Sequence, residues 1–123
     1  MSAEAETGRL VAVTGATGFI GGALARRLVE SGWQVRALVR SPARAKALSA
    51  LGATLISGDL SHPDALERLV AGADAVVHCA GAVRGIDRAD FDPVNATGVT
   101  NLVRVGAAQP RPPRFLALSS LAA

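Results

Sequence analysis

The chain has few of the residues that build cross-linked, membrane-spanning or base-stacking proteins. Its 123 residues include one cysteine, no tyrosine and only 3% aromatic residues. A lone Cys79 cannot form an internal disulfide, which excludes a disulfide-stapled secreted scaffold and makes a cytoplasmic location the expected one. No run of about 18 apolar residues is free of Arg, Asp and Glu, so we expect no membrane partner.

The charge balance is only weakly basic. Thirteen Lys and Arg residues face ten Asp and Glu residues, which gives a formal net charge of +3. The arginines are scattered from Arg9 to Arg114, with almost no aromatic side chains between them to stack on bases. We therefore expect a solvated surface and no nucleic-acid partner, and a basic nucleic-acid-binding domain is the weakest alternative.

The length and the hydrophobic content favour one folded unit. Half of the residues are hydrophobic and 19% are charged, which is typical of a soluble globular domain. A chain of 123 residues can bury one core and has no room for a second. We expect a polar N-terminal tail over residues 1–8 and a single domain over residues 9–123.

Short apolar runs alternate with helical patterns along this domain. The predicted strands cover residues 9–14, 33–39, 53–57, 75–79 and 115–119. The predicted helices cover residues 19–31, 42–51, 63–70 and about 89–108. Ser41 is expected to cap the second helix, and Ser61 or His62 the third. Strands that alternate with helices predict an α/β protein with a doubly wound parallel sheet.

Three glycines follow the first predicted strand, at Gly15, Gly18 and Gly21. Gly15 allows a tight turn, Gly18 lets backbone approach a bound phosphate, and Gly21 lets the helix pack closely on the sheet. The helix N-terminus offers unpaired N–H groups and a partial positive charge to a pyrophosphate. A strand, this turn, a helix and a second strand in order favour a dinucleotide site over a purely structural turn. No lysine follows the glycines, which argues against an ATP- or GTP-hydrolysing loop.

The end of the second predicted strand indicates which dinucleotide binds. Proteins that favour NAD usually place a carboxylate there, which accepts hydrogen bonds from the ribose. This chain has Arg40 instead, and an arginine can pair with the 2′-phosphate of NADP. The sequence therefore favours NADP, with NAD as the alternative and with Ser41 and Arg44 as candidate helpers. An ordinary surface arginine is the competing interpretation.

Further motifs follow in order. Asp59 and Leu60 come after the third predicted strand, and Cys79, Ala80 and Gly81 end the fourth. A segment around Asn95 opens the next helix, and the fifth strand runs toward Ser120. With the glycine turn, these motifs resemble the short-chain dehydrogenase/reductase superfamily. The closest resemblance is to its extended branch, the NAD-dependent epimerase/dehydratase family, and it runs through nearly all of the chain from Leu10 onward.

The resemblance implies a Rossmann-type sheet of about five strands in the order 3-2-1-4-5, present here in truncated form. It also implies that Asp59 and Leu60 hold the adenine ring, and that the small residues after the fourth strand line the ribose and nicotinamide. Taken alone, Asp59 also fits a turn or a cap, and Asn95 also fits a helix cap. The expected cofactor-binding residues are Gly15, Thr17, Gly18, Phe19, Ile20, Gly21, Arg40, Asp59, Leu60, Cys79, Ala80, Gly81 and Asn95.

The catalytic part of the family pattern is incomplete. Ser120 matches the family's catalytic-site serine, but the family also uses a Tyr-x-x-x-Lys pair. The chain has no tyrosine, and its only lysine, Lys46, falls in the second predicted helix. We expect a cofactor-binding N-terminal part of an NAD(P)-dependent oxidoreductase, epimerase or dehydratase that is not catalytically competent alone. We assign no catalytic role to His78 or Cys79, and no Cys/His cluster has the spacing of a metal site.

Two alternatives concern what the chain does with a dinucleotide and with other chains. A non-enzymatic NADP-binding sensor or interaction module would need the same cofactor residues and no tyrosine. In the order 3-2-1-4-5, the fifth strand is an uncovered sheet edge. Such an edge invites pairing, so we expect a homo-oligomer or a partner chain at this strand.

Overall fold

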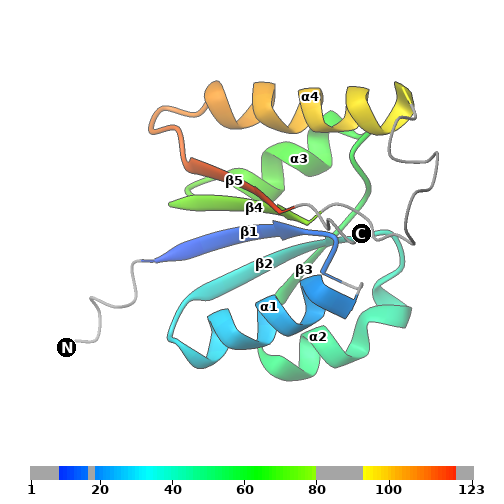
Figure 1. Ribbon diagram of the computed structural model, residues 1–123, viewed down its shortest axis with the longest axis vertical. Coiled ribbons are helices and arrows are strands. Elements are labelled where there is room, and N and C mark those ends of the chain that lie inside the picture. The colour runs from blue at the N-terminus through cyan, green and yellow to red at the C-terminus, as the bar shows by residue number, and fades with distance from the viewer. Residues whose placement is uncertain (1–8, 17–18, 80–92, 119–123) are drawn as a thin grey trace.

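Five parallel strands form a single sheet in the order β3-β2-β1-β4-β5 (Figure 1). The computed structural model describes residues 9–16, 19–79 and 93–118. The predicted Rossmann-type α/β class and strand order are confirmed. The strands are β1 (Leu10–Thr14), β2 (Gln34–Val39), β3 (Thr54–Ser57), β4 (Ala75–Cys79) and β5 (Arg114–Leu118).

Helices cover both faces of this sheet. Figure 1 shows α1 and α2 on one face and α3 and α4 on the other. The helices are α1 (Phe19–Glu30), α2 (Lys46–Leu51), α3 (Pro63–Val70) and α4 (Pro93–Ala107), with a 3-10 turn at Pro42–Ala45 before α2. Within the ranges that the structure describes, no helix combines the length and apolar content needed to cross a bilayer.

The centre of the sheet is buried on both faces, which explains why β1 and β4 are nearly continuous apolar runs. Along β1, Val11 and Val13 pack toward α1 and α2, whereas Ala12 packs toward α3 and α4. All three are at most 1% exposed. On the face where Ala12 lies, the core is formed by apolar side chains from two helices, namely Leu66, Leu69 and Val70 of α3 and Leu102 of α4.

The predicted helix over residues 42–51 is divided, and Ser41 holds the predicted cap position without capping through its side chain. Ser41 has an extended backbone, but its side chain makes no capping hydrogen bond. The N–H of Arg44 donates instead to the backbone oxygen of Ser41 at 2.9 Å, which closes a 3-10 turn. The α-helical part begins only at Lys46 and ends at Gly52, whose left-handed φ of +108° suits glycine.

The third helix has its cap residue at His62, and that residue's side chain makes no capping bond either. The hydroxyl of Ser61 donates to Asp59 instead. Pro93 opens α4, where a proline loses no helical hydrogen bond. Residues 89–92, which we expected at the start of this helix, lie outside the described residues.

Parallel pairing places the carboxyl ends of all the strands at one edge of the sheet. Thr14 of β1 lies in register with His78 of β4, and Val39 of β2 with Ser57 of β3. The residues that leave these strands therefore start from neighbouring positions. In open α/β sheets this edge is where ligands bind.

Candidate functional site

The turn after β1 fits only glycine at its first position. Gly15 has a left-handed φ of +75°. A Cβ built there would collide with the carbonyl oxygen of Cys79 and would lie 3.0 Å from the Cβ of that residue. The chain therefore passes directly against the end of β4 as it leaves β1, so the turn lies in close contact with the sheet edge.

A second close contact joins this turn to α1. A Cβ on Gly21 would collide with the carbonyl oxygen of Gly15 and would lie 3.0 Å from the Cα of Ala16. The closest approach that Gly21 permits is thus between α1 and the turn, and the expected packing of the helix on the sheet at this glycine stays a prediction. Phe19 and Ile20 open α1, whose N-terminus therefore directly follows the turn. Thr17 and Gly18 lie outside the described residues.

A polar pair of one buried and one half-buried side chain joins the strand ends beside this turn. The hydroxyl of Thr14 and Nδ1 of His78 share a hydrogen bond of 2.6 Å between β1 and β4. Thr14 is 2% exposed, and partial burial lowers the pKa of His78, which favours its neutral imidazole. The bond gives each of these two side chains a partner and links the two strand ends that flank the turn. His78, to which we assigned no catalytic role, makes this structural contact.

The end of β3 is held against β2 and α3. The N–H of Gly58 donates to the carbonyl oxygen of Val39 at 2.9 Å. A Cβ on Gly58, whose φ is +149°, would lie 2.5 Å from the Cβ of Ala65 in α3. Arg40 follows Val39 and is exposed. Arg40, after β2, and Asp59, which follows Gly58 after β3, therefore start from neighbouring strand ends.

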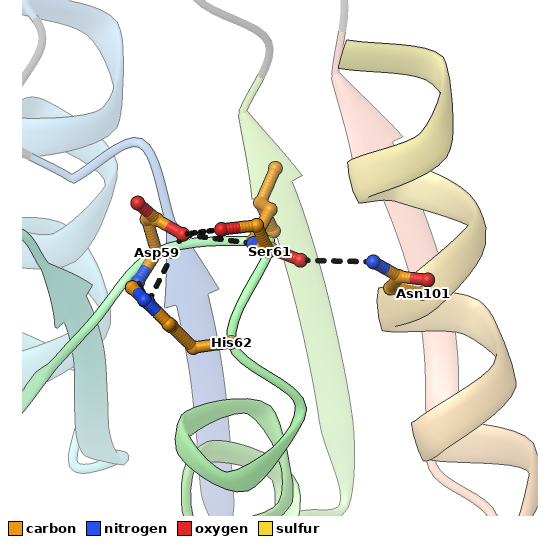
Figure 2. Close-up of polar contacts among 5 residues, drawn as sticks. Asp59, Ser61, His62 and Asn101 are labelled. Carbon is orange, nitrogen blue, oxygen red and sulfur yellow. Dashed lines mark hydrogen bonds and ion pairs between the residues drawn. The ribbon is translucent and has the colours of Figure 1, made fainter. Parts of the chain in front are cut away.

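Asp59 organises a tight turn (Figure 2). Its Oδ1 accepts hydrogen bonds from the N–H of Ser61 at 2.8 Å and from the Ser61 hydroxyl at 2.6 Å. Its N–H donates to Nδ1 of His62 at 3.2 Å. The two Ser61 hydrogen bonds are the main cause that holds the pKa of the Asp59 carboxyl below its ordinary value, and the charge of Arg40 adds to it. The carboxylate is therefore ionised at neutral pH, and its contacts with described residues all fall on Oδ1.

The structure brings together about half of the residues predicted to bind cofactor. Gly15, Gly21, Arg40, Asp59 and Cys79 lie at or just beyond the carboxyl ends of β1, β2, β3 and β4, and the half-buried Leu60 follows Asp59. Asn95 lies in the first turn of α4. The predicted residues Thr17, Gly18, Ala80, Gly81 and Ser120 lie outside the described residues.

The chemistry of the described site is that of binding. Cys79 is buried, and burial raises the pKa of its thiol, so the protonated form dominates at neutral pH. In the described part of the chain, no group of three or more His, Cys, Asp and Glu side chains is arranged to hold a metal ion. Among the described residues, this edge presents a glycine turn, a helix N-terminus, the Asp59 carboxylate and the exposed Arg40 guanidinium.

Several contacts that shape the site were not predicted from the sequence. They are the Thr14–His78 pair, the hydrogen bonds that Ser61 donates to Asp59, and the bond from the amide of Asn101 to the carbonyl oxygen of Leu60 at 3.2 Å. The Asp-x-Ser spacing was a usable local signal, since Asp side chains commonly accept from the residue two positions on. The other two contacts join residues 64 and 41 positions apart and have no local signal.

Comparison with known proteins gives a consistent assignment. A family model described as NAD(P)H-binding matches residues 15–123. A ceramide reductase from Caulobacter vibrioides is 40% identical over 114 residues, which cover 93% of this chain and 35% of that protein. The chain therefore spans about a third of the length of this curated relative.

Two solved structures add coenzymes to the comparison. An NADPH-dependent quinone oxidoreductase from Escherichia coli, complexed with NADPH, superposes with a TM-score of 0.65 at 28% identity over 80% of this chain and 32% of its own. A short-chain dehydrogenase/reductase superfamily protein from Agrobacterium tumefaciens, with bound NAD, gives 0.66 at 30% identity over 89% and 32%. Since one holds NADPH and the other NAD, these neighbours do not decide which coenzyme this chain prefers.

Proposed function

The chain belongs to the NAD(P)H-binding family, in its extended short-chain dehydrogenase/reductase type, and we propose that it binds NADP in preference to NAD. The observation that carries the preference is the exposed Arg40 at the end of β2, where a carboxylate would select NAD. The site proposed is the edge formed by the carboxyl ends of β1, β2, β3 and β4.

Each part of the dinucleotide has a proposed partner at this edge. The pyrophosphate is expected over the turn between Gly15 and Gly21, where the N-terminus of α1 contributes free N–H groups and a partial positive charge. The adenine is expected against Asp59 and Leu60. The 2′-phosphate is expected at Arg40, because a guanidinium can donate two parallel hydrogen bonds to it.

The preference is tested by titrating NADPH and NADH into the chain and into Arg40→Ala. The matched control is Arg26→Ala, an exposed arginine on α1. A charge-assisted contact contributes about 1.5–3 kcal/mol, so Arg40→Ala should weaken NADPH binding by roughly 10- to 100-fold and leave NADH nearly unchanged. Equal affinities of the unaltered chain for the two coenzymes would contradict the proposal.

We further propose that the whole protein is a reductase that transfers hydride from NADPH to a carbonyl substrate. Support comes from a ceramide reductase among the relatives, and from Ser120, the proposed catalytic-site serine. The 123 residues contain no tyrosine, and the one lysine, Lys46, opens α2. The chain by itself is therefore expected to bind NADPH without oxidising it. Loss of NADPH absorbance with a panel of ketones would contradict this.

The edge strand β5 supports a proposal about partners. Leu116 is 54% exposed and Phe115 is 36% exposed, and among the described strands β5 pairs only with β4. We expect this edge to pair with a second copy or with another chain, in a reducing compartment such as the cytoplasm, where the free thiol of Cys79 is preserved. A monodisperse monomer in light scattering at high concentration would contradict self-association.

A further inference from the structure

The loop that carries Leu60 is held from a distant part of the chain. We propose that α4, through Gly98 and Asn101, positions Leu60 and thereby sets the affinity of the site for the adenine half of the dinucleotide. The inference rests on the proposed function, because Leu60 is there placed against the adenine. It adds two positioning residues that do not themselves touch the dinucleotide.

The first observation is a hydrogen bond. The Nδ2 of Asn101 donates to the carbonyl oxygen of Leu60 at 3.2 Å, across 41 residues of sequence (Figure 2). Leu60 lies in the loop between β3 and α3, so neither a strand nor a helix fixes its carbonyl group. The side chain of Asn101, on a helix anchored in the core by Leu102, holds that carbonyl group in one direction.

The second observation is a close approach of backbone to side chain. A Cβ built on Gly98 would lie 2.8 Å from the Cβ of Leu60 and 3.1 Å from its Cδ1. The closer atom is the Cβ of Leu60, which cannot move without its backbone. Gly98 and Asn101 are three residues apart, so they share one face of α4, and both contacts converge on Leu60.

The position of the Leu60 backbone also affects its two neighbours, Asp59 and Ser61. Asp59, before it, and Ser61, after it, are joined to one another by the two hydrogen bonds on Oδ1. That local turn sets the shape of the loop, whereas the contacts with α4 set its distance from the core. A shift of Leu60 therefore carries the Asp59 carboxylate with it, and both proposed adenine contacts move together.

Gly98→Ala and Gly106→Ala form a matched pair in the same helix. A Cβ on Gly106 would meet only Pro113, at 3.7 Å or more, which is ordinary contact. Both substitutions gain helix propensity, but only Gly98→Ala displaces Leu60. The probes are NADPH, adenosine 2′,5′-bisphosphate for the adenine half and nicotinamide mononucleotide for the other half, each titrated well below the Tm of every variant.

We expect Gly98→Ala to weaken the binding of NADPH and of the bisphosphate by the same factor, about tenfold. The binding of nicotinamide mononucleotide should be unchanged. Gly106→Ala should bind all three as the unaltered chain does. If Gly98 had a merely structural role, Gly98→Ala would lower Tm without weakening the binding of the adenine half selectively. Equal binding by Gly98→Ala and Gly106→Ala would overturn the inference alone, whereas an unaltered chain that binds no dinucleotide overturns the proposed function as well.

Asn101→Leu tests the hydrogen bond separately, and it decides the matter if Gly98→Ala does not fold. Its control is Gln109→Leu, because the amide of Gln109 donates only to the carbonyl oxygen of Val105, at 3.5 Å. Loss of one hydrogen bond predicts about fivefold weaker binding of the bisphosphate by Asn101→Leu. Unchanged binding by Asn101→Leu would remove Asn101 from the proposal.

Discussion

Arg36 allows a quantitative prediction about what holds α3 in place. Its Nη1 donates to the carbonyl oxygens of Arg68 at 2.8 Å, Leu69 at 2.9 Å and Ala71 at 2.8 Å. These oxygens lie in the last turn of α3 or just beyond it, where a helix leaves carbonyl groups without partners. The guanidinium also places a positive charge at the negative end of the helix dipole.

The expected cost of removing this group follows from its geometry. Nη1 carries two hydrogens, so the three contacts share two N–H groups and count as about two charge-assisted hydrogen bonds of roughly 1.5 kcal/mol each. The contacts with Arg68 and Ala71 are exposed, so water replaces part of what is lost. We therefore expect Arg36→Met, which keeps the apolar stem, to lower the free energy of unfolding by about 2 kcal/mol.

The measurement is urea unfolding followed by circular dichroism, with a thermal melt beside it. For a domain of this size, a loss of this magnitude lowers Tm by roughly 8 °C. Arg26→Met is the control, because Arg26 is an exposed arginine on α1, and Arg36→Lys should fall between the two. A difference between Arg36→Met and the control below about 0.5 kcal/mol would refute the argument.

Two further predictions concern the site. Gly21→Ala should destabilise the chain by about 1–3 kcal/mol and weaken NADPH binding, because the new Cβ collides with the Gly15 carbonyl oxygen. Gly22→Ala, whose Cβ would lie 3.2 Å from the nearest carbonyl oxygen, should cost less in thermal melts and titrations. The lowered pKa of Asp59 contributes stability that is present above its ordinary pKa of about 3.9 and is lost as the pH falls below it. Ser61→Ala should raise that pKa in an NMR titration, and an unchanged value would contradict the assigned cause.

The strands that are buried on both faces of the sheet were the elements most predictable from the sequence. The inner strands β1 and β4 are nearly continuous apolar runs because helices cover the sheet on either side. The predicted end of the second helix at residue 51 agrees with the structure, where Gly52 closes α2 with a positive φ. The division of the second helix was not predicted, because the backbone carbonyl group of Ser41, and not its side chain, takes the bond that forms the turn.

The site was predictable where its residues follow a local pattern. Glycine spacing located Gly15 and Gly21, although the contact of Gly21 with the carbonyl oxygen of Gly15 was not predicted. Contacts between distant segments had no such pattern. The bond from Asn101 to Leu60, and those from Arg36 to the end of α3, join residues whose pairing depends on how the helices cross the sheet.

The central claim is that a nicotinamide dinucleotide binds at the carboxyl edge of the sheet, and chemical-shift mapping tests it most directly. We predict that NADPH, added to the ¹⁵N-labelled chain, shifts the amide signals of Gly15, Arg40 and Asp59. The signals of Gly32 and Gly72, which precede β2 and β4 at the opposite edge, should stay in place. Shifts at those two glycines alone, or no shifts at saturating NADPH or NADH, would contradict the account.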